Sequence, residues 1–233
     1  MKIRTTSLLF AMVLGFSLTA CVPAAMSGGA TSSAAGAASG TSTQATNTST
    51  GTLLVSFAGS SSVLSAQNGT VETNSYSERP GDASKQAPAR EGNAMSFAYT
   101  LSKSAGSSYL GAGMTIGTPS NTALDLSRFR AVKIRVASSV AKSLRIRVGG
   151  SDLTVQNSGC YPVSYINVSN KLETYTIALS AFAPESFCAP STPNLTQTLG
   201  GVSYFEVADN ALPSNGPISG KITLESIEFV EKP

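Results

Sequence analysis

The chain has 233 residues, 12% of them charged, and a formal net charge of +3. Without Lys2 and Arg4 of the N-terminal segment, 14 basic residues stand against 13 acidic ones, a balance that argues against nucleic acid as a partner. Histidine is absent, which excludes Ser-His-Asp and Cys-His catalysis and histidine-ligated zinc or haem, and favours a protein that is not an enzyme.

The N-terminal residues have the composition of an export signal. Lys2 and Arg4 precede an apolar run at 8–18 that is too short to span a bilayer, which predicts a signal peptide over 1–20. The segment Leu18-Thr-Ala-Cys21 resembles the bacterial lipoprotein box, which implies cleavage before Cys21, acylation of that cysteine (palmitate) and anchoring in the lipid bilayer. Val22 implies sorting to the bacterial outer membrane, with the domain in the periplasm or at the cell surface. The alternative is an ordinary signal peptide with a chance cysteine.

A low-complexity segment separates this signal from the foldable part of the chain. Residues 21–50 are mostly Ala, Ser, Thr and Gly without a charge, so they are predicted to form a flexible tether. Residues 51–233 then form one domain. In an exported domain we expect a disulfide between Cys160 and Cys188, and two separate buried thiols are the alternative.

The first part of the domain contains two strongly alternating segments and one polar stretch. Apolar side chains alternate with small or polar ones over 95–101 and 110–116, which predicts two strands, and an apolar run predicts another at 53–57. Residues 60–93 are polar and interrupted by prolines, so we expect a long loop with one irregular strand at 70–76. Phe97 and Tyr99 share a face with Met95 and Leu101, which favours a place in the core.

The clearest alternation in the chain lies at 125–150. Apolar residues at 132, 134 and 136 and at 144, 146 and 148 predict two half-buried strands, and the few residues between them favour an antiparallel hairpin. Asp125, before the first strand, is expected to cap a turn by accepting from a backbone amide. On the polar side of the hairpin we expect four cations within cross-strand range: Lys133, Arg135, Arg145 and Arg147.

The rest of the domain continues as short strands. They are predicted at 153–156, 163–168, 173–179, 202–207 and 221–230, with no helix longer than a turn at 180–182. In the last strand the apolar positions change phase near Glu225 and Ser226, which predicts a β-bulge. About ten strands separated by turns indicate an all-β fold, an antiparallel sandwich or barrel.

The order of these landmarks resembles a known family. The region from 52 to 230 looks like the galactose-binding-like jelly rolls of carbohydrate-binding modules and of the complex I intermediate-associated protein 30 type of domain. This resemblance implies an antiparallel two-sheet β-sandwich with about five strands in each sheet, a ligand face and often a structural calcium. It makes Glu225 a candidate calcium ligand, although Ala58 stands where the family has an acidic residue. The resemblance is carried by the segments 92–99, 109–114, 125–129, 174–182 and 222–229.

The four cations of the hairpin are the candidate ligand contacts. Arginine presents a planar fork that suits carboxylate and phosphate, so we hypothesise contact with an acidic glycan or a phosphorylated envelope polymer through Lys133, Arg135, Arg145 and Arg147. Because the chain has no tryptophan, stacking on sugar rings falls to tyrosines such as Tyr109 and Tyr161. The alternative is a solvated outer face whose long side chains cover apolar surface.

Two functions fit this sequence, and a third is disfavoured. The favoured function is that of a lipid-anchored, non-catalytic cell-envelope protein whose β-sandwich binds carbohydrate or a related envelope polymer. The rival is a scaffolding lipoprotein that mediates protein–protein contact. A carboxylate-dependent hydrolase needs two carboxylates roughly 5–10 Å apart in a cleft, and no acidic pair in the sequence indicates one.

Overall fold

The computed structural model describes residues 52–58, 69–118, 122–140 and 143–231. These residues fall within one unit of the chain, Asn47–Pro233. The signal peptide, the tether and the lipidation of Cys21 lie outside the described residues and stay predictions. In the described part of the chain, no helix is long and apolar enough to cross a membrane.

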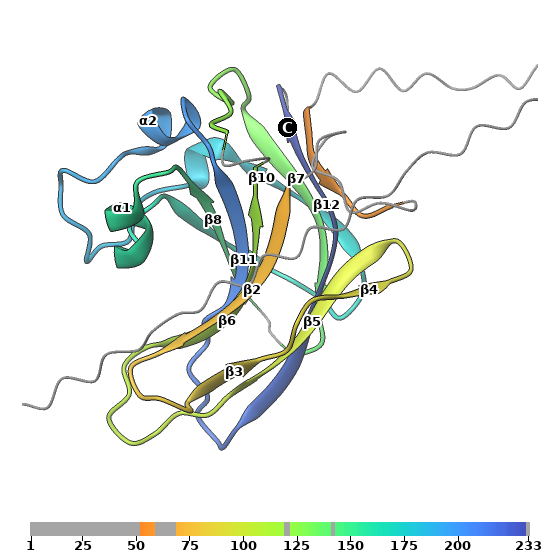
Figure 1. The fold of residues 1–233 in the computed structure, drawn as a ribbon, viewed down its shortest axis with the longest axis vertical. Helices are drawn as coiled ribbons and strands as arrows, with labels where there is room; N and C mark the ends of the chain where they lie inside the picture. Colours follow the sequence, from red (N-terminus) through yellow and green to blue (C-terminus); the bar gives the residue numbers. More distant parts are fainter. Residues whose placement is uncertain (1–51, 59–68, 119–121, 141–142, 232–233) are drawn as a thin grey trace, which may run out of the picture. The chain divides into compact units, whose positions relative to one another are not determined.

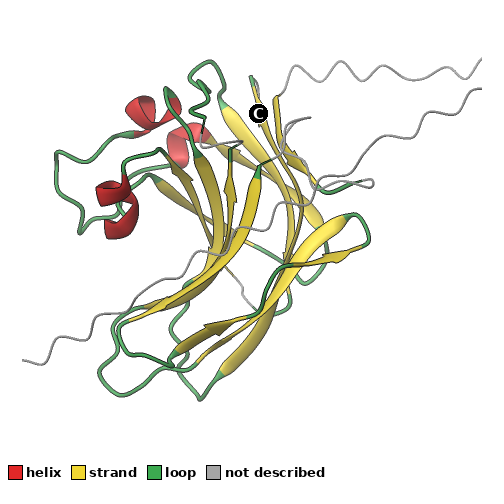
Figure 2. Cartoon of the chain, viewed as in Figure 1, coloured by secondary structure: helices red, strands yellow, loops and turns green. Residues whose placement is uncertain are grey.

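The described residues form two antiparallel β-sheets, which confirms the predicted two-sheet β-sandwich (Figure 1, Figure 2). The five-stranded sheet has the order β2 (Thr70–Ser77), β6 (Leu110–Gly117), β11 (Tyr204–Asp209), β8 (Ser143–Gly149) and β9 (Val163–Asn167). The seven-stranded sheet has the order β10 (Glu173–Ala178), β7 (Ala131–Ser138), β12 (Ile218–Val230), β5 (Ala94–Leu101) and β3 (Ala83–Lys85), with β1 (Thr52–Ser56) on β12 and β4 (Ala89–Glu91) on β5.

The apolar sides of the two sheets meet in one core. Ile134 of β7 and Ile146 of β8 are completely buried in it, as the alternation predicted. Phe97 and Tyr99 are buried in the same core, which confirms their expected place. Full burial of an aliphatic or aromatic side chain stabilises the fold by about 1.5–3 kcal/mol. The period-two pattern therefore identifies the inward face of each strand.

The predicted hairpin between β7 and β8 was wrong. β7 pairs with β10 and β12 in the seven-stranded sheet, whereas β8 pairs with β11 and β9 in the five-stranded sheet. The short connection crosses from one sheet to the other, so the two apolar faces approach the core from opposite sides. Alternation specifies which face of a strand is buried but not its neighbour, because either pairing buries the same side chains.

The segment expected as a long loop forms regular structure where it is described. β2 is a full strand, and β3 and β4 follow it, while residues 59–68 lie outside the described residues. On the inward side of β2, Val71 packs against the core and the hydroxyl of Thr73 donates to the carbonyl of Gln86 at 2.8 Å. Because a polar side chain takes an inward position and bonds to backbone, the sequence shows no clear apolar period there.

The strand expected at 153–156 was also wrong, since helix α1 (Leu153–Ser158) takes its place. Asp152 accepts hydrogen bonds from the backbone amides of Thr154 and Val155 at 2.8 and 3.3 Å. Gly159 ends the helix in the left-handed region, with φ at 76°. This N-cap and glycine C-cap outweigh the strand preference of the short apolar run.

Three smaller predictions are confirmed. The turn expected at 180–182 is the 3-10 helix η2 (Leu179–Ala181). The register of β12 against β7 shifts between Leu224 and Ser226, which is the predicted bulge. The backbone amide of Ser127 donates to Asp125 at 3.0 Å, which is the predicted turn cap. The sequence interpretation missed helix α2 (Leu195–Leu199), which begins with a capping box.

Candidate functional site

The side of the five-stranded sheet that is turned away from the core carries the candidate site, and we call it the polar face. Side chains alternate between the two sides of a strand, so the strand registers place every second residue on this side. The polar face consists of Thr70, Glu72, Asn74 and Tyr76 of β2, Gly111, Gly113, Thr115 and Gly117 of β6, Tyr204, Glu206 and Ala208 of β11, Ser143, Arg145, Arg147 and Gly149 of β8, and Val163, Tyr165 and Asn167 of β9.

Glu206 lies at the centre of the polar face and has 0% of its surface exposed. Its carboxylate accepts from Arg147 at 2.6 Å and from Arg145 at 3.4 Å. The side-chain amide of Asn74 donates to its other oxygen at 3.1 Å and to the hydroxyl of Thr115 at 2.9 Å. These contacts link β2, β6, β11 and β8 across the sheet. A buried carboxylate needs such partners, because burial of an unpaired charge costs several kcal/mol.

Arg145 extends this network to two connections beside the sheet. Its guanidinium donates to Glu185 Oε1 at 3.3 Å and to the carbonyl of Gly159 at 3.1 Å. The predicted disulfide between Cys160 and Cys188 is confirmed, with an S–S distance of 2.12 Å. It joins the same two connections, one after α1 and one after η2.

Two tyrosine rings of the polar face lie against glycines. A Cβ on Gly111 would lie 2.4 Å from Cζ of Tyr76, and a Cβ on Gly149 would lie 2.0 Å from Cζ of Tyr204. Such contacts are closer than real side chains allow, so the rings can approach the sheet only because glycine stands at both positions. The guanidinium of Arg147 lies 5.6 Å from the centroid of the Tyr204 ring, a cation–π geometry.

Two more tyrosines border this arrangement. Tyr165 is 50% exposed, and its hydroxyl donates to Glu185 at 2.7 Å. Tyr161 packs edge-on against Tyr204 with ring centroids 5.8 Å apart. The polar face therefore combines a central ion-paired network with aromatic side chains near both the β2 and the β9 edge of the sheet.

Unpaired buried atoms gather on the polar face. In the described residues, four buried side-chain nitrogen or oxygen atoms lack a hydrogen-bond partner, and three of them are Asn74 Oδ1, Arg147 Nε and Tyr204 Oη. Leaving such an atom unsatisfied costs roughly 1–3 kcal/mol, and such atoms in native proteins call for an explanation, such as a functional role. Burial raises the pKa of Tyr204 above its ordinary value, so its hydroxyl keeps the proton it can donate.

The four predicted cations do not form one cluster, so that prediction was wrong. Arg145 and Arg147 lie on the polar face, but Lys133 and Arg135 point outward from the seven-stranded sheet. Arg135 donates to Glu225 at 3.0 Å there. The two pairs separate because β7 and β8 belong to different sheets, whose outer sides face away from each other.

One of the two predicted tyrosines borders the polar face, and three residues of this face were not predicted. Tyr161 borders the polar face. Tyr109 precedes β6 and is 55% exposed, and among the described residues we find no contact between it and the network around Glu206. The sequence interpretation missed Glu206, Asn74 and Tyr204. Their signal was the polar residue at every second position of β2 and the polar residues at 204 and 206 of β11. Asn74 lies 132 positions before Glu206, and only the strand register brings the two together.

Glu225, the predicted calcium ligand, pairs with an arginine. Calcium takes 6–8 oxygen ligands with several carboxylates. In the described part of the chain no group of three or more His, Cys, Asp and Glu side chains lies close enough to hold a metal ion, and the Glu225 carboxylate accepts from Arg135. The Phe57 carbonyl, near the family's acidic position, accepts from Arg90. Calcium binding therefore stays a prediction.

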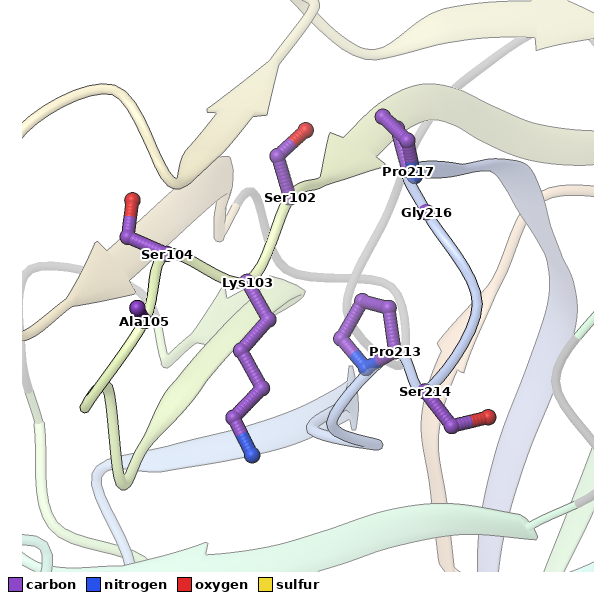
Figure 3. A pocket seen from close by; sticks show the side chains of 8 residues that line it. All are labelled: Ser102, Lys103, Ser104, Ala105, Pro213, Ser214, Gly216 and Pro217. Carbon is purple, nitrogen blue, oxygen red and sulfur yellow. The ribbon is translucent and has the colours of Figure 1, made fainter.

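Two pockets lie outside the network. One of about 500 Å³ lies between the connection after β5 and the connection before β12 (Figure 3), and among its eight described lining residues Lys103 alone is charged. The other, of about 290 Å³, is lined by Tyr161 and by residues of the α1 and α2 connections. The pocket of Figure 3 has no aromatic side chain in its lining, which distinguishes it from the polar face.

No protein-family model and no curated protein matches this sequence. The fold is similar to the family 11 carbohydrate-binding module from Clostridium thermocellum in complex with a β-1,3-1,4-mixed-linked tetrasaccharide, with 17% identity, a TM-score of 0.50, and 78% of this chain and 96% of that chain covered. The likeness to the family 11 module of a cellulosomal cellulase from Clostridium thermocellum has 19% identity and a TM-score of 0.48 over 77% and 94% of the two chains. An exo-β-agarase matches at 12% identity and a TM-score of 0.43, over 78% of this chain and 25% of that chain.

Proposed function

We propose that the polar face binds a glycan chain and that the protein is a non-catalytic carbohydrate-binding protein. The observation that carries this proposal is the ion-paired network around Glu206 on the outer side of the sheet, with Tyr76 and Tyr204 against glycines and Tyr165 50% exposed beside it. Sugars offer matching chemistry, since their hydroxyls both donate and accept hydrogen bonds and their apolar ring faces stack on aromatic side chains.

The charges on the polar face favour a neutral glycan over an acidic one. Arg145 and Arg147 both pair with Glu206, Arg145 also pairs with Glu185, and Glu72 adds an exposed carboxylate to the same face. Guanidinium groups that are already paired with carboxylates have little net attraction for an anion. The ligand class therefore narrows from an acidic polymer to a glycan recognised through its hydroxyls and ring faces.

The fold likeness supports this proposal. The Clostridium thermocellum module has the same kind of β-sandwich and is in complex with a mixed-linked tetrasaccharide, so that oligosaccharide is a suitable first probe for this chain. The scaffolding alternative would be favoured by an outer sheet face of apolar side chains, and the polar face has the opposite character.

The same network argues against hydrolysis. Glu206 and Glu185 both contact Arg145, but hydrolysis needs one carboxyl that can donate a proton and a second that reaches the sugar or its water. Glu206 is completely buried, and its oxygens accept from Arg145, Arg147 and Asn74. A carboxylate held in this way is a structural acceptor.

The test is a glycan array followed by calorimetric titration of the purified full chain. We expect binding that weakens about tenfold or more in Gly149→Ala, which displaces the Tyr204 ring, and in Tyr165→Ala. Arg135→Ala is the matched control, because it removes a cation from the other sheet and should leave affinity unchanged. Circular dichroism checks that each variant is folded. Binding equal in all variants would refute the polar face as the site, and no binding to any glycan would favour scaffolding.

We also propose that the domain is displayed on a lipid-anchored chain, on the strength of the sequence around Cys21. Cys21→Ser is expected to move the protein from the membrane fraction to the soluble fraction. Mass spectrometry should find acyl chains on the wild-type cysteine, and their absence from membrane-associated protein would count against the anchor.

A further inference from the structure

Arg145 depends on two contacts that the sheet itself does not supply. Besides Glu206, it donates to the carbonyl of Gly159, which follows α1, and to the carboxylate of Glu185, which follows η2. Glu185 also accepts from the hydroxyl of Tyr165, and that hydroxyl lies 3.5 Å from the side-chain amide of Asn210. The β9 edge of the polar face is therefore positioned by two connections beside the sheet.

The disulfide joins those two connections at the same place. Cys160 directly follows Gly159, and the backbone amide of Cys188 donates to the carbonyl of Glu185 at 2.9 Å. The bond thus holds both outer partners of Arg145 together. The sulfur bridge, the two acceptors and the guanidinium form one continuous unit.

The unit lies outside the core of the sandwich. Helix α1 has no buried residue, and Phe187 beside Cys188 is 71% exposed. The backbone hydrogen bonds that we find between residues 185 and 192 stay within that segment. Ala183, two residues before Glu185, exchanges backbone hydrogen bonds with Val163 of β9 at 2.9 and 3.0 Å. Beyond Ala183, the contacts that we find between this connection and the sheet are those of the Glu185 side chain, and the disulfide ties it to the connection after α1. Opening the disulfide therefore removes a restraint on the site without exposing the core.

We propose that the Cys160–Cys188 disulfide is a redox-sensitive brace of the polar face, an inference that rests on the proposed glycan function. A dithiol reductant transfers two electrons and two protons, so that the S–S bond becomes two thiols and the dithiol becomes a disulfide. Cys160 is buried whereas Cys188 is partly exposed, so attack occurs at the sulfur of Cys188. Glu185 then becomes less constrained, so Tyr165 and Arg145 lose a fixed partner, while Arg145 keeps its contact with Glu206.

The experiment compares the full oxidised chain, the chain reduced with dithiothreitol and the C160S/C188S variant. The probe is the arrayed oligosaccharide that the oxidised chain binds most tightly, and its affinity should fall about tenfold on reduction and in the variant. Dithiothreitol should not change the affinity of the variant. Hydrogen exchange should accelerate at residues 159–166 and 184–188 while β6, β11 and β12 stay protected.

Glu185→Ala provides a second test that leaves the disulfide intact. As a positioning residue, Glu185 should give the same loss of affinity as reduction, whereas Glu231→Ala, near the C-terminus, should give none. Glu185→Gln keeps the shape and should recover most of the affinity.

Three results would overturn the brace. The first is that glycan affinity and hydrogen exchange stay unchanged after both thiols are shown to be free. The second is that reduction accelerates hydrogen exchange throughout both sheets. The third is that Glu185→Ala keeps full glycan affinity. If the oxidised chain binds no glycan, the proposed function fails instead, and the exchange data alone decide whether the disulfide holds the connections.

Discussion

Replacing Glu206 with glutamine tests whether the polar face is one interdependent network. The variant keeps the size of the side chain and one oxygen acceptor, but it removes the charge that faces Arg147 at 2.6 Å and Arg145 at 3.4 Å. Breaking a buried ion pair costs about 3–5 kcal/mol, and the retained hydrogen bond reduces this loss. We expect the free energy of unfolding to fall by about 2–4 kcal/mol.

The protein contains its own control for this measurement. Glu225 contacts Arg135 at 3.0 Å on the other sheet, where the side chains are 24% and 40% exposed. Exposed ion pairs contribute about 0–1 kcal/mol, so Glu225→Gln should lower the free energy of unfolding by no more than that. The chemistry of the change is the same at both sites, and burial is what distinguishes them.

Urea unfolding followed by circular dichroism provides the measurement. The midpoint should shift for Glu206→Gln while the slope with urea stays constant, which means that stability and not the extent of unfolding has changed. Combining the variant with Arg147→Met should restore part of the loss, since the two side chains share one network. A Glu206→Gln loss no larger than that of Glu225→Gln would refute the reasoning.

Two further predictions concern the rest of the sandwich. The Tyr99 hydroxyl of β5 donates to buried Asp209 of β11 at 2.6 Å, so Tyr99→Phe should lower the free energy of unfolding by about 1–3 kcal/mol in the same urea assay. A change no larger than that of Tyr109→Phe, at a tyrosine that is 55% exposed, would contradict this. Hydrogen bonds from Ser104, and then from Ser107, lower the pKa of Asp82, so its contribution to stability is present above the unfolded pKa of about 4 and is lost as pH falls through the lower folded value. Between pH 7 and pH 2 the unfolding midpoint of Asp82→Asn should therefore fall less steeply with decreasing pH than the midpoint of the wild-type protein. Equal slopes in the variant and the wild type would contradict this role of Asp82.

Much of the sandwich could be predicted because its signal is local. Ile134 and Ile146 lie in strands whose apolar period is complete over a few residues, and that period specifies the buried side. The disulfide followed from the presence of two cysteines in a domain that the sequence predicts to be exported. The helix at 153–158 was missed because a short apolar run fits both structures, and its caps, Asp152 and Gly159, decided between them.

The candidate site was predicted only in part because its members are brought together by register. Arg145 and Arg147 were selected correctly as neighbours on one strand face, but Glu206 and Asn74 come from strands far away in the sequence. From the sequence alone, a single glutamate on the polar side of an alternating strand is expected to be exposed to solvent. Glu206 is instead completely buried against Arg147, directly opposite it on β8, and the neighbouring Arg145, and the local sequence pattern does not show these partners.

By itself the sequence determined the fold class, the inward face of each alternating strand and the pairing of the two cysteines of the domain. The first two depend on patterns among neighbouring residues, and the third follows because two cysteines can form only one disulfide. Only the tertiary structure decided that β7 and β8 lie in different sheets. That separation divides four cations into a pair on the outside of one sheet and a pair neutralised by Glu206 on the other. The physical reason is that strand alternation is set within a strand, whereas partner choice is set by packing across the whole domain.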